Sequence, residues 1–467
     1  MSLDDDEQIC FKCPLEEIPQ EKRSSVVELD CSNEGLNVLS PEFADLTNLQ
    51  RLDCSYNSLK EFPFIICQLE YLSILICKEN QMITIPSEIS QLECLEVLDC
   101  SYNHLISLHP AIGQLGYLKE LNCCWNQLIA LPLGIGHLHL LTSLNCSSNN
   151  LVTLLPDGIG ELWNLRELNC RANKLTTLPL GIGQLGHLTI LDCSCNQLEE
   201  LSSEIGQLIS LEQLICNGNQ LRTLPSTISQ LKNLTELDCS HNQLITLPLG
   251  IGQLEHLIGL YCYSNQLEEL SSEIGQLTSL KELKCADCQM TSLPPEIGHL
   301  KCLTILYCSC NQITNMPPEI GQLMSLTELI CSYNLMINLP PEIGQLKYLR
   351  ILDCQWNSLK GLPPEIGQLI FLRELNCSSN QMIDLPPEIG LLTNLTVLDC
   401  SYNQMIDLPL EIAHLTHLKM VFCFGNRFMQ MPEKLESLFM SSFVNPHGNV
   451  FDSTGRYTKR LKSDDSV

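Results

Sequence analysis

Cysteine is the residue type in this chain that could carry chemistry by itself, with 27 among 467 residues. Two pairs have the C-x-x-C spacing: Cys10 with Cys13 in "ICFKCPLEEIP", and Cys285 with Cys288 in "KCADC". That spacing can supply half of a zinc site or a redox dithiol. Whether either chemistry is possible depends on the elements that position the two pairs.

Most of the cysteines follow a strict period. A cysteine two residues after an apolar residue, here termed the marker cysteine, recurs 18 times, and successive markers are 23 residues apart except for one step of 24. Such a period indicates a repeat protein with no inserted domain. The markers are Cys31, Cys54, Cys77, Cys100, Cys123, Cys146, Cys170, Cys193, Cys216, Cys239, Cys262, Cys285, Cys308, Cys331, Cys354, Cys377, Cys400 and Cys423.

Each repeat has two halves. In the first, as in "LTELDCSHNQL", Leu237 and Cys239 alternate with polar residues, which is the period of a half-buried strand. In the second, as in "LPPEIGQL", Pro341 suits the first turn of a helix, and Ile343 and Leu346 share one face. The sequence therefore predicts a strand, a turn and a short helix or 3-10 turn, stacked so that neighbouring repeats share one core.

The residue three after the marker is asparagine in 16 of the 18 repeats, and Glu34 and Cys288 replace it in the others. A short amide can satisfy the backbone groups of the turn that follows each strand, so we expect a ladder of amides along the stack. Both C-x-x-C pairs then have a structural explanation, because Cys10 aligns with marker Cys400 and Cys13 falls in the asparagine position. We therefore predict no metal ion and no cofactor.

The repeat resembles the leucine-rich repeat superfamily over residues 10–443, on the motifs L-x-x-L-x-C-x-x-N-x-L and L-P-x-x-I-G-x-L. It is most similar to the intracellular "LPPEIGQL" class, which includes Ras-suppressor and Ras-scaffold proteins and many bacterial proteins. The resemblance implies an α/β repeat solenoid, an arc with a parallel β-sheet on its concave face and short helices or 3-10 turns on its convex face. It also implies a concave face that binds protein. Cysteine stands where the superfamily usually has leucine.

The repeat boundaries divide the chain into four predicted parts. Residues 1–26 form an acidic segment and a degenerate half-repeat that seals the core, and residues 27–430 hold the eighteen repeats. We expect a C-terminal cap over residues 431–443. The last part, residues 444–467, is predicted to be a basic, disordered tail.

Charge and missing motifs exclude several functions. A net charge of −28 disfavours binding to nucleic acid or to an anionic membrane and favours a protein partner with a basic surface. No signal peptide and no long apolar run is present, so we expect a cytoplasmic, reducing location with free thiols, and no membrane span. No catalytic motif occurs, and the histidines are scattered. We predict that the protein is not an enzyme and has no catalytic residues, and we do not expect a small-molecule ligand.

The strand period predicts which slots face the open concave surface. These are the slots three before, one before, one after and two after the marker. They hold 16 acidic side chains, which are interpreted either as a solvated surface or as a landing surface for a basic partner. Cys124, Cys195 and Cys310 fall in the last two slots, so we expect them to be the reactive thiols, whereas burial leaves the marker thiols inert.

Aromatic residues gather in the same slots of five consecutive repeats, markers Cys262 to Cys354. Tyrosine and tryptophan are common anchors of protein interfaces. We therefore predict a non-catalytic protein scaffold or adaptor, with signalling as one role open to it. The alternative is a bacterial effector that binds protein inside a host cell. The predicted binding residues are Tyr261, Tyr263, Ile305, Tyr307, Ile330, Tyr333, Ile351 and Trp356, with Asp238, Glu282, Asp287, Glu328 and Asp353 as a polar rim.

Overall fold

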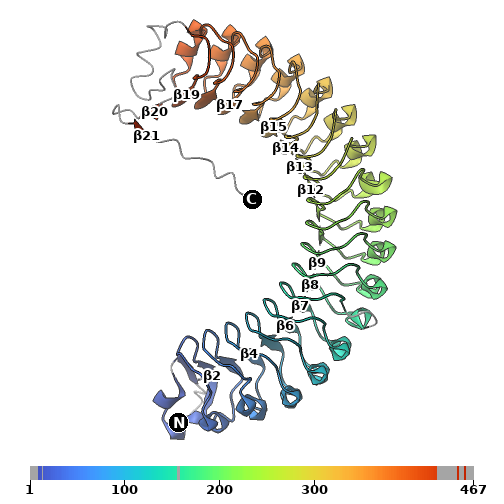
Figure 1. Ribbon diagram of the computed structural model, residues 1–467, viewed down its shortest axis with the longest axis vertical. Helices are drawn as coiled ribbons and strands as arrows, with labels where there is room; N and C mark the ends of the chain where they lie inside the picture. The colour runs from blue at the N-terminus through green and yellow to red at the C-terminus, as the bar shows by residue number, and fades with distance from the viewer. Residues whose placement is uncertain (1–8, 13, 155–157, 429–449, 452–456, 459–467) are drawn as a thin grey trace, which may run out of the picture. The chain divides into compact units, whose positions relative to one another are not determined.

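The computed structural model describes residues 9–12, 14–154, 158–428, 450–451 and 457–458. The chain divides into two compact units, Met1–Leu237 and Asp238–Val467, which are described separately. Within each unit, strands lie side by side on the inner side of a curve and 3-10 helices lie on the outer side (Figure 1). The predicted repeat fold is therefore confirmed, with 3-10 helices between the strands of the described residues and one short α-helix, α1 (Gln20–Arg23), between the first two strands.

In the first unit, strands β1 to β10 pair in parallel, each with the next one in the chain. They are β1 (Ile9–Lys12), β2 (Val26–Asp30), β3 (Arg51–Asp53), β4 (Ile74–Ile76), β5 (Val97–Asp99), β6 (Glu120–Asn122), β7 (Ser143–Asn145), β8 (Glu167–Asn169), β9 (Ile190–Asp192) and β10 (Gln213–Ile215), and β11 (Glu236–Asp238) follows. The helices are η1 (Leu15–Glu17), α1 (Gln20–Arg23), η2 (Pro41–Asp45), η3 (Phe64–Gln68), η4 (Ser87–Gln91), η5 (Pro110–Gln114), η6 (Leu133–His137), η7 (Ile159–Glu161), η8 (Leu180–Gln184), η9 (Ser203–Gln207) and η10 (Ser226–Gln230).

In the second unit, strands β12 to β19 pair in the same way. They are β12 (Gly259–Tyr261), β13 (Glu282–Lys284), β14 (Ile305–Tyr307), β15 (Glu328–Ile330), β16 (Ile351–Asp353), β17 (Glu374–Asn376), β18 (Val397–Asp399) and β19 (Met420–Phe422). The helices are η11 (Leu249–Gln253), η12 (Ser272–Gln276), η13 (Pro295–His299), η14 (Pro318–Gln322), η15 (Pro341–Gln345), η16 (Pro364–Gln368), η17 (Pro387–Leu391) and η18 (Leu410–His414). A separate antiparallel pair joins β20 (Val450–Phe451) to β21 (Tyr457–Thr458).

Strand register places identical slots of neighbouring repeats next to one another. Leu306 of β14 pairs with Leu329 of β15, and Leu329 pairs with Leu352 of β16. These leucines and the marker cysteines that follow them are fully buried. The core of each unit is thus a stack of leucine and cysteine layers, as the alternating pattern predicts.

At Gly344 the 3-10 helices pack so closely that a side chain would collide with the next helix. A Cβ atom added at Gly344 of η15 would lie 2.5 Å from the backbone oxygen of Glu365 in η16. Ile343, the residue before it, is fully buried. The Ile-Gly pair of the repeat therefore combines a core side chain with a close backbone approach between helices.

The predicted amide ladder is confirmed. The Asn334 side-chain amide donates to the backbone oxygens of Cys308, Cys331 and Ser332 at 3.0 to 3.1 Å. Its side-chain oxygen accepts a hydrogen bond from the backbone N–H of Ile313 at 2.9 Å. Each asparagine thus links its own strand end to the preceding repeat.

The N-terminal half-repeat differs from the prediction. Cys10 pairs with Glu28 of β2 rather than with marker Cys31, and it is exposed rather than buried. Phe11 instead pairs with Leu29. A terminal strand has one neighbour only, so the apolar contact of Phe11 sets its register and the C-x-x-C alignment does not. Cys13 lies outside the described residues.

Two further predicted parts fall largely outside the described residues. The predicted cap over residues 431–443 lies wholly outside them, and of the predicted tail, residues 444–467, the structure describes β20 and β21. Over the part of the chain that is described, no helix has the length and apolar character needed to cross a membrane.

Candidate protein-binding face of the second unit

The predicted site residues on strands form two rows across the sheet. Register aligns Tyr261, Lys284, Tyr307, Ile330 and Asp353 in one row from β12 to β16. The second row lies two residues earlier in each strand and contains Gly259, Glu282, Ile305, Glu328 and Ile351. All eight strand residues predicted from β12 to β16, including Asp353, lie in these two rows, so the structure brings them together.

Lys284 is the centre of the first row. Its Nζ lies 5.0 Å from the ring centroid of Tyr261 and 5.5 Å from that of Tyr307, within the range of a cation–π interaction. The same Nζ lies 3.5 Å from a carboxylate oxygen of Glu282. The sequence prediction did not include this lysine, although its slot one before marker Cys285 would have placed it there.

Both tyrosine hydroxyls of this row donate to carboxylates. The Tyr261 hydroxyl donates to Glu282 at 3.1 Å, and that of Tyr307 donates to Glu328 at 2.9 Å. Burial, and then the adjacent Glu328, raise the pKa of Tyr307 to about 12. The phenol therefore stays protonated as a hydrogen-bond donor throughout the neutral range.

An open cavity of about 380 Å³ lies over these residues. Its lining combines three tyrosine rings with one anion and one cation, which suits a partner side chain that has both apolar and polar parts. The lining residues are Asp238, Tyr261, Tyr263, Lys284, Ala286 and Tyr307.

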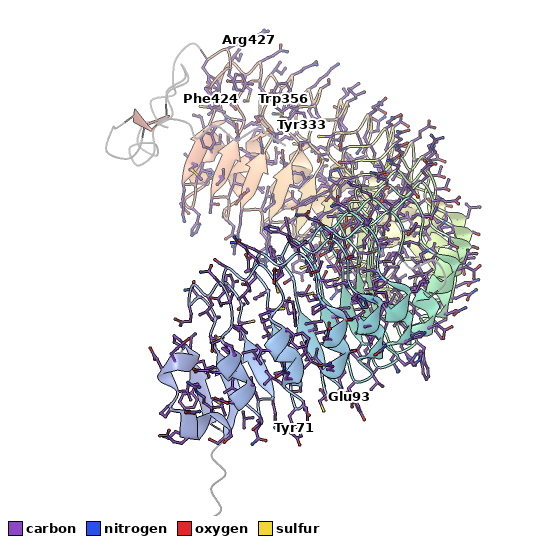
Figure 2. The ribbon with its side chains drawn as sticks, turned by 60° about the horizontal axis from the view of Figure 1, so that its bottom comes forward. Tyr71, Glu93, Tyr333, Trp356, Phe424 and Arg427 are labelled. Carbon is purple, nitrogen blue, oxygen red and sulfur yellow. The ribbon has the colours of Figure 1, made fainter. Side chains whose placement is uncertain are left out.

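The remaining aromatic residues lie at the turn that follows each strand. Tyr333 and Trp356 stack with ring centroids 5.5 Å apart and an interplanar angle of 10°, and they are 48% and 54% exposed. Both have φ in the left-handed region, +53° and +51°. Figure 2 shows them along one edge of the strands, together with Phe424. Tyr263, one residue nearer the strand in its repeat, packs edge-on against His241 at 5.0 Å.

The slot one after the marker is mostly not open, contrary to the prediction. Ser240 is 0% exposed and Ser332 is 4% exposed. The Asp238 carboxylate accepts hydrogen bonds from the Ser240 backbone N–H at 3.0 Å and from its hydroxyl at 2.6 Å. This contact turns the serine back over the end of the strand. The recurring Asp-Cys-Ser tripeptide is the sequence signal that could have revealed it.

Carboxylates of the predicted polar rim accept hydrogen bonds from nearby groups of the protein. Asp353 accepts from the backbone N–H of Gln355 at 3.1 Å, and its pKa is raised, chiefly by burial. Asp287, at an exposed turn position, accepts from the Ser264 hydroxyl at 2.8 Å. The carboxylates thus cap strand ends and turns in addition to giving the face its negative charge.

The thiols also differ in part from the prediction. Cys124 is buried at 6% exposure, because its slot is the one that turns back over the strand end. Cys195 is half-buried and Cys310 is exposed. Cys94 and Cys302 are exposed in the turn that precedes a strand, where strand alternation did not predict them.

Parallel strands in register, joined by 3-10 helices and closed by an asparagine ladder, define a leucine-rich repeat solenoid. The profile "Leucine Rich repeats (2 copies)" matches residues 209–250, 278–318 and 370–411, and "Leucine Rich Repeat" matches residues 48–69 and 140–162. The leucine-rich repeat protein LIC12759 of Leptospira interrogans is 35% identical, with 92% of this chain and 97% of that chain covered and a TM-score of 0.74. The chain belongs to the leucine-rich repeat family.

Two other solved structures bear on the site and the core. The plant peptide hormone receptor RGFR1, solved in complex with RGF2, is 25% identical over 92% of this chain and 82% of that chain, with a TM-score of 0.67. The functional domain of InlJ from Listeria monocytogenes, which includes a cysteine ladder, is 26% identical over 81% and 72%, with a TM-score of 0.60. A search of curated protein sequences found no match. Leucine-rich repeat proteins generally mediate protein–protein interactions and are generally non-enzymatic.

Proposed function

We propose that the protein is a non-catalytic scaffold or adaptor that holds a protein partner on the concave face of its second unit. The observation that carries the proposal is the grouping of Tyr261, Lys284 and Tyr307 in one row beside the cavity. Solubility of this surface would require polar side chains only, so it does not explain two tyrosines on either side of a lysine. Large amphipathic rings beside charged groups are typical of the centre of a protein interface.

The partner presents a basic surface with apolar side chains. Carboxylates of Glu282, Glu328 and Asp287 surround the tyrosines and would speed association with a cation-rich surface. The stacked pair of Tyr333 and Trp356 adds an exposed apolar edge. Free thiols and the acidic face suit a reducing cytoplasm, where such a scaffold would act in signalling.

Capture of one partner by the wild type and by variants tests this proposal. Trp356→Ala or Tyr307→Ala should reduce capture by roughly thirtyfold, the effect of losing a central aromatic anchor. Tyr56→Ala is the matched control, because Tyr56 is a 53% exposed aromatic residue in the first unit. Retained capture by both anchor variants, with loss in Tyr56→Ala, would place the site in the first unit instead.

A bacterial effector that binds protein inside a host cell is the second candidate. The similarity to the Leptospira interrogans protein, at 35% identity, favours this form of the function. Parallel capture from a bacterial lysate and from an animal-cell lysate separates the two. A partner found only in the animal lysate, and lost with Trp356→Ala, supports the effector.

A further inference from the structure

A second surface lies at the opposite ends of the strands, where each chain segment enters the sheet. Two successive repeats read "LKYLR" and "LIFLR" just before β16 and β17. Tyr348 and Phe371 stack there with ring centroids 6.0 Å apart and an interplanar angle of 14°. Their side chains are 57% and 46% exposed. In the first unit, Tyr71 (labelled in Figure 2) occupies the same repeat position and is also exposed.

Two arginines stand beside this stacked pair. The Arg373 backbone N–H donates to the Arg350 backbone oxygen at 2.8 Å, so the two residues occupy equivalent positions on neighbouring repeats. Both are exposed, as is Lys347. Within the described ranges, none of these three cations forms an ion pair, although Glu374 follows Arg373 directly.

The fold does not require arginine at these positions. The repeats on either side have threonine, whose hydroxyl donates to the backbone oxygen of the preceding repeat. Thr327 donates to Thr304 at 2.9 Å, and Thr396 donates to Arg373 at 2.9 Å. Arginine at 350 and 373 gives up that local hydrogen bond and presents two guanidinium groups to solvent.

We propose that this edge patch binds an extended acidic segment of a second protein partner. Guanidinium groups pair with carboxylates through two parallel hydrogen bonds, and the stacked rings offer an apolar platform for a side chain between them. Charge complementarity selects this occupant, because the patch is a group of unpaired cations on a strongly acidic chain. The edge patch consists of Lys347, Tyr348, Arg350, Ile370, Phe371 and Arg373.

The edge patch and the concave face would serve different partners. The stacked pair Tyr333 and Trp356 follows the strands, whereas Tyr348 and Phe371 precede them. The edge patch carries three cations, whereas Asp287 and Asp353 lie where the strands end. The second unit could therefore hold a basic and an acidic partner together, and the edge patch does not depend on the function proposed above.

Binding of short fluorescent peptides to the full chain tests the proposal. An acidic peptide that alternates Glu with Leu or Phe should bind the wild type, and its Lys-for-Glu analogue should not. Arg350→Gln with Arg373→Gln should weaken binding roughly tenfold or more, the effect of losing charged hydrogen bonds. Tyr348→Ser with Phe371→Ser should weaken it by a similar factor while circular dichroism and melting temperature change little.

Lys281→Gln is the matched control, because Lys281 is exposed in the same slot of another repeat of this unit and no aromatic pair adjoins it. It should bind the acidic peptide as the wild type does. An equal loss in Lys281→Gln, no loss in the double arginine variant, or no acidic-peptide binding up to about 1 mM overturns the proposal. Tighter binding of a single-stranded oligonucleotide than of the acidic peptide would also overturn it.

Discussion

The asparagine ladder is interrupted at Cys288, and the structure shows how a thiol replaces an amide. The Cys288 sulfur lies 3.5 Å from the backbone oxygen of Cys262 and 3.4 Å from that of Ala286, the oxygens that an asparagine amide would reach. The backbone N–H of Leu267 points at the same sulfur. Sulfur is a weak donor and a weak acceptor, so this repeat is held less firmly than its neighbours.

Restoring the amide should stabilise the protein. Cys288→Asn is expected to raise the free energy of unfolding by about 1 kcal/mol, the net value of a buried hydrogen bond, as measured by urea denaturation. The reverse change in the next repeat, Asn311→Cys, should lower it by about 1 to 3 kcal/mol because strong backbone partners are left unpaired. A gain from both substitutions would contradict this account of the ladder.

Native thiol labelling should follow exposure rather than repeat position. We expect fast reaction at Cys94 and Cys302, slower reaction at Cys10 and Cys310, whose pKa values are raised, and none at the marker cysteines. Burial and then Asp287 raise the pKa of Cys310, which lowers its thiolate fraction. Mass spectrometry of labelled peptides measures this order, and all 27 cysteines should react in denaturant. Labelling of Cys331 in the native protein would refute the buried ladder.

The contact between successive 3-10 helices can be tested with two glycines of one repeat region. Gly344→Ala should destabilise the second unit by about 1 to 3 kcal/mol, the usual cost of overpacking, because the new methyl group meets the Glu365 backbone. Gly361→Ala is the control, since a Cβ there has nothing within 4 Å. Equal melting temperatures for the two variants would show that the helices can separate at little cost.

At the same scale, the sequence predicts the strands well, because their period is strict and the register places leucine on leucine from β2 to β10 and from β12 to β18. The sequence-based prediction fails where a strand has only one neighbouring strand, as at Cys10. It also fails where a hydrogen bond turns a side chain away from the face that strand alternation predicts, as in Ser240, which donates to Asp238. The edge patch was missed because Tyr348 and Phe371 lie in a turn, to which strand alternation does not apply.

The candidate concave site was predictable in part for the same reason. Strand residues such as Tyr307 and Ile330 follow the alternation and meet in one row. Tyr333 and Trp356 lie instead at left-handed turn positions along the edge, where φ rather than strand period sets their direction. Lys284 lies in a slot predicted to face the open surface but is not among the predicted binding residues, because its role depends on the two rings beside it.

At the scale of the whole molecule, each unit contains a continuous series of buried cysteine thiols, which are weak acids. All nine marker cysteines of the second unit have raised pKa values, with burial as the largest cause, as in Cys308 at about 12 and Cys423 at about 11. In the unfolded chain a thiol ionises near pH 8.5 to 9. Above that pH the unfolded state binds fewer protons than the native state, so stability falls as pH rises.

The protein should therefore unfold steeply in mild alkali. Each pH unit above about 9 lowers the free energy of unfolding by about 1.4 kcal/mol per buried thiol, so nine thiols give roughly 12 kcal/mol, comparable with the whole stability of a domain. Urea denaturation with reductant at about pH 7.5, 9 and 10 measures the slope. The double variant Cys331→Ala/Cys354→Ala should reduce that slope by about 2.7 kcal/mol per pH unit, because two thiols no longer titrate, while tyrosine and lysine contribute equally to both proteins. An unchanged slope in the variant would mean that the buried thiols do not govern the alkaline limit.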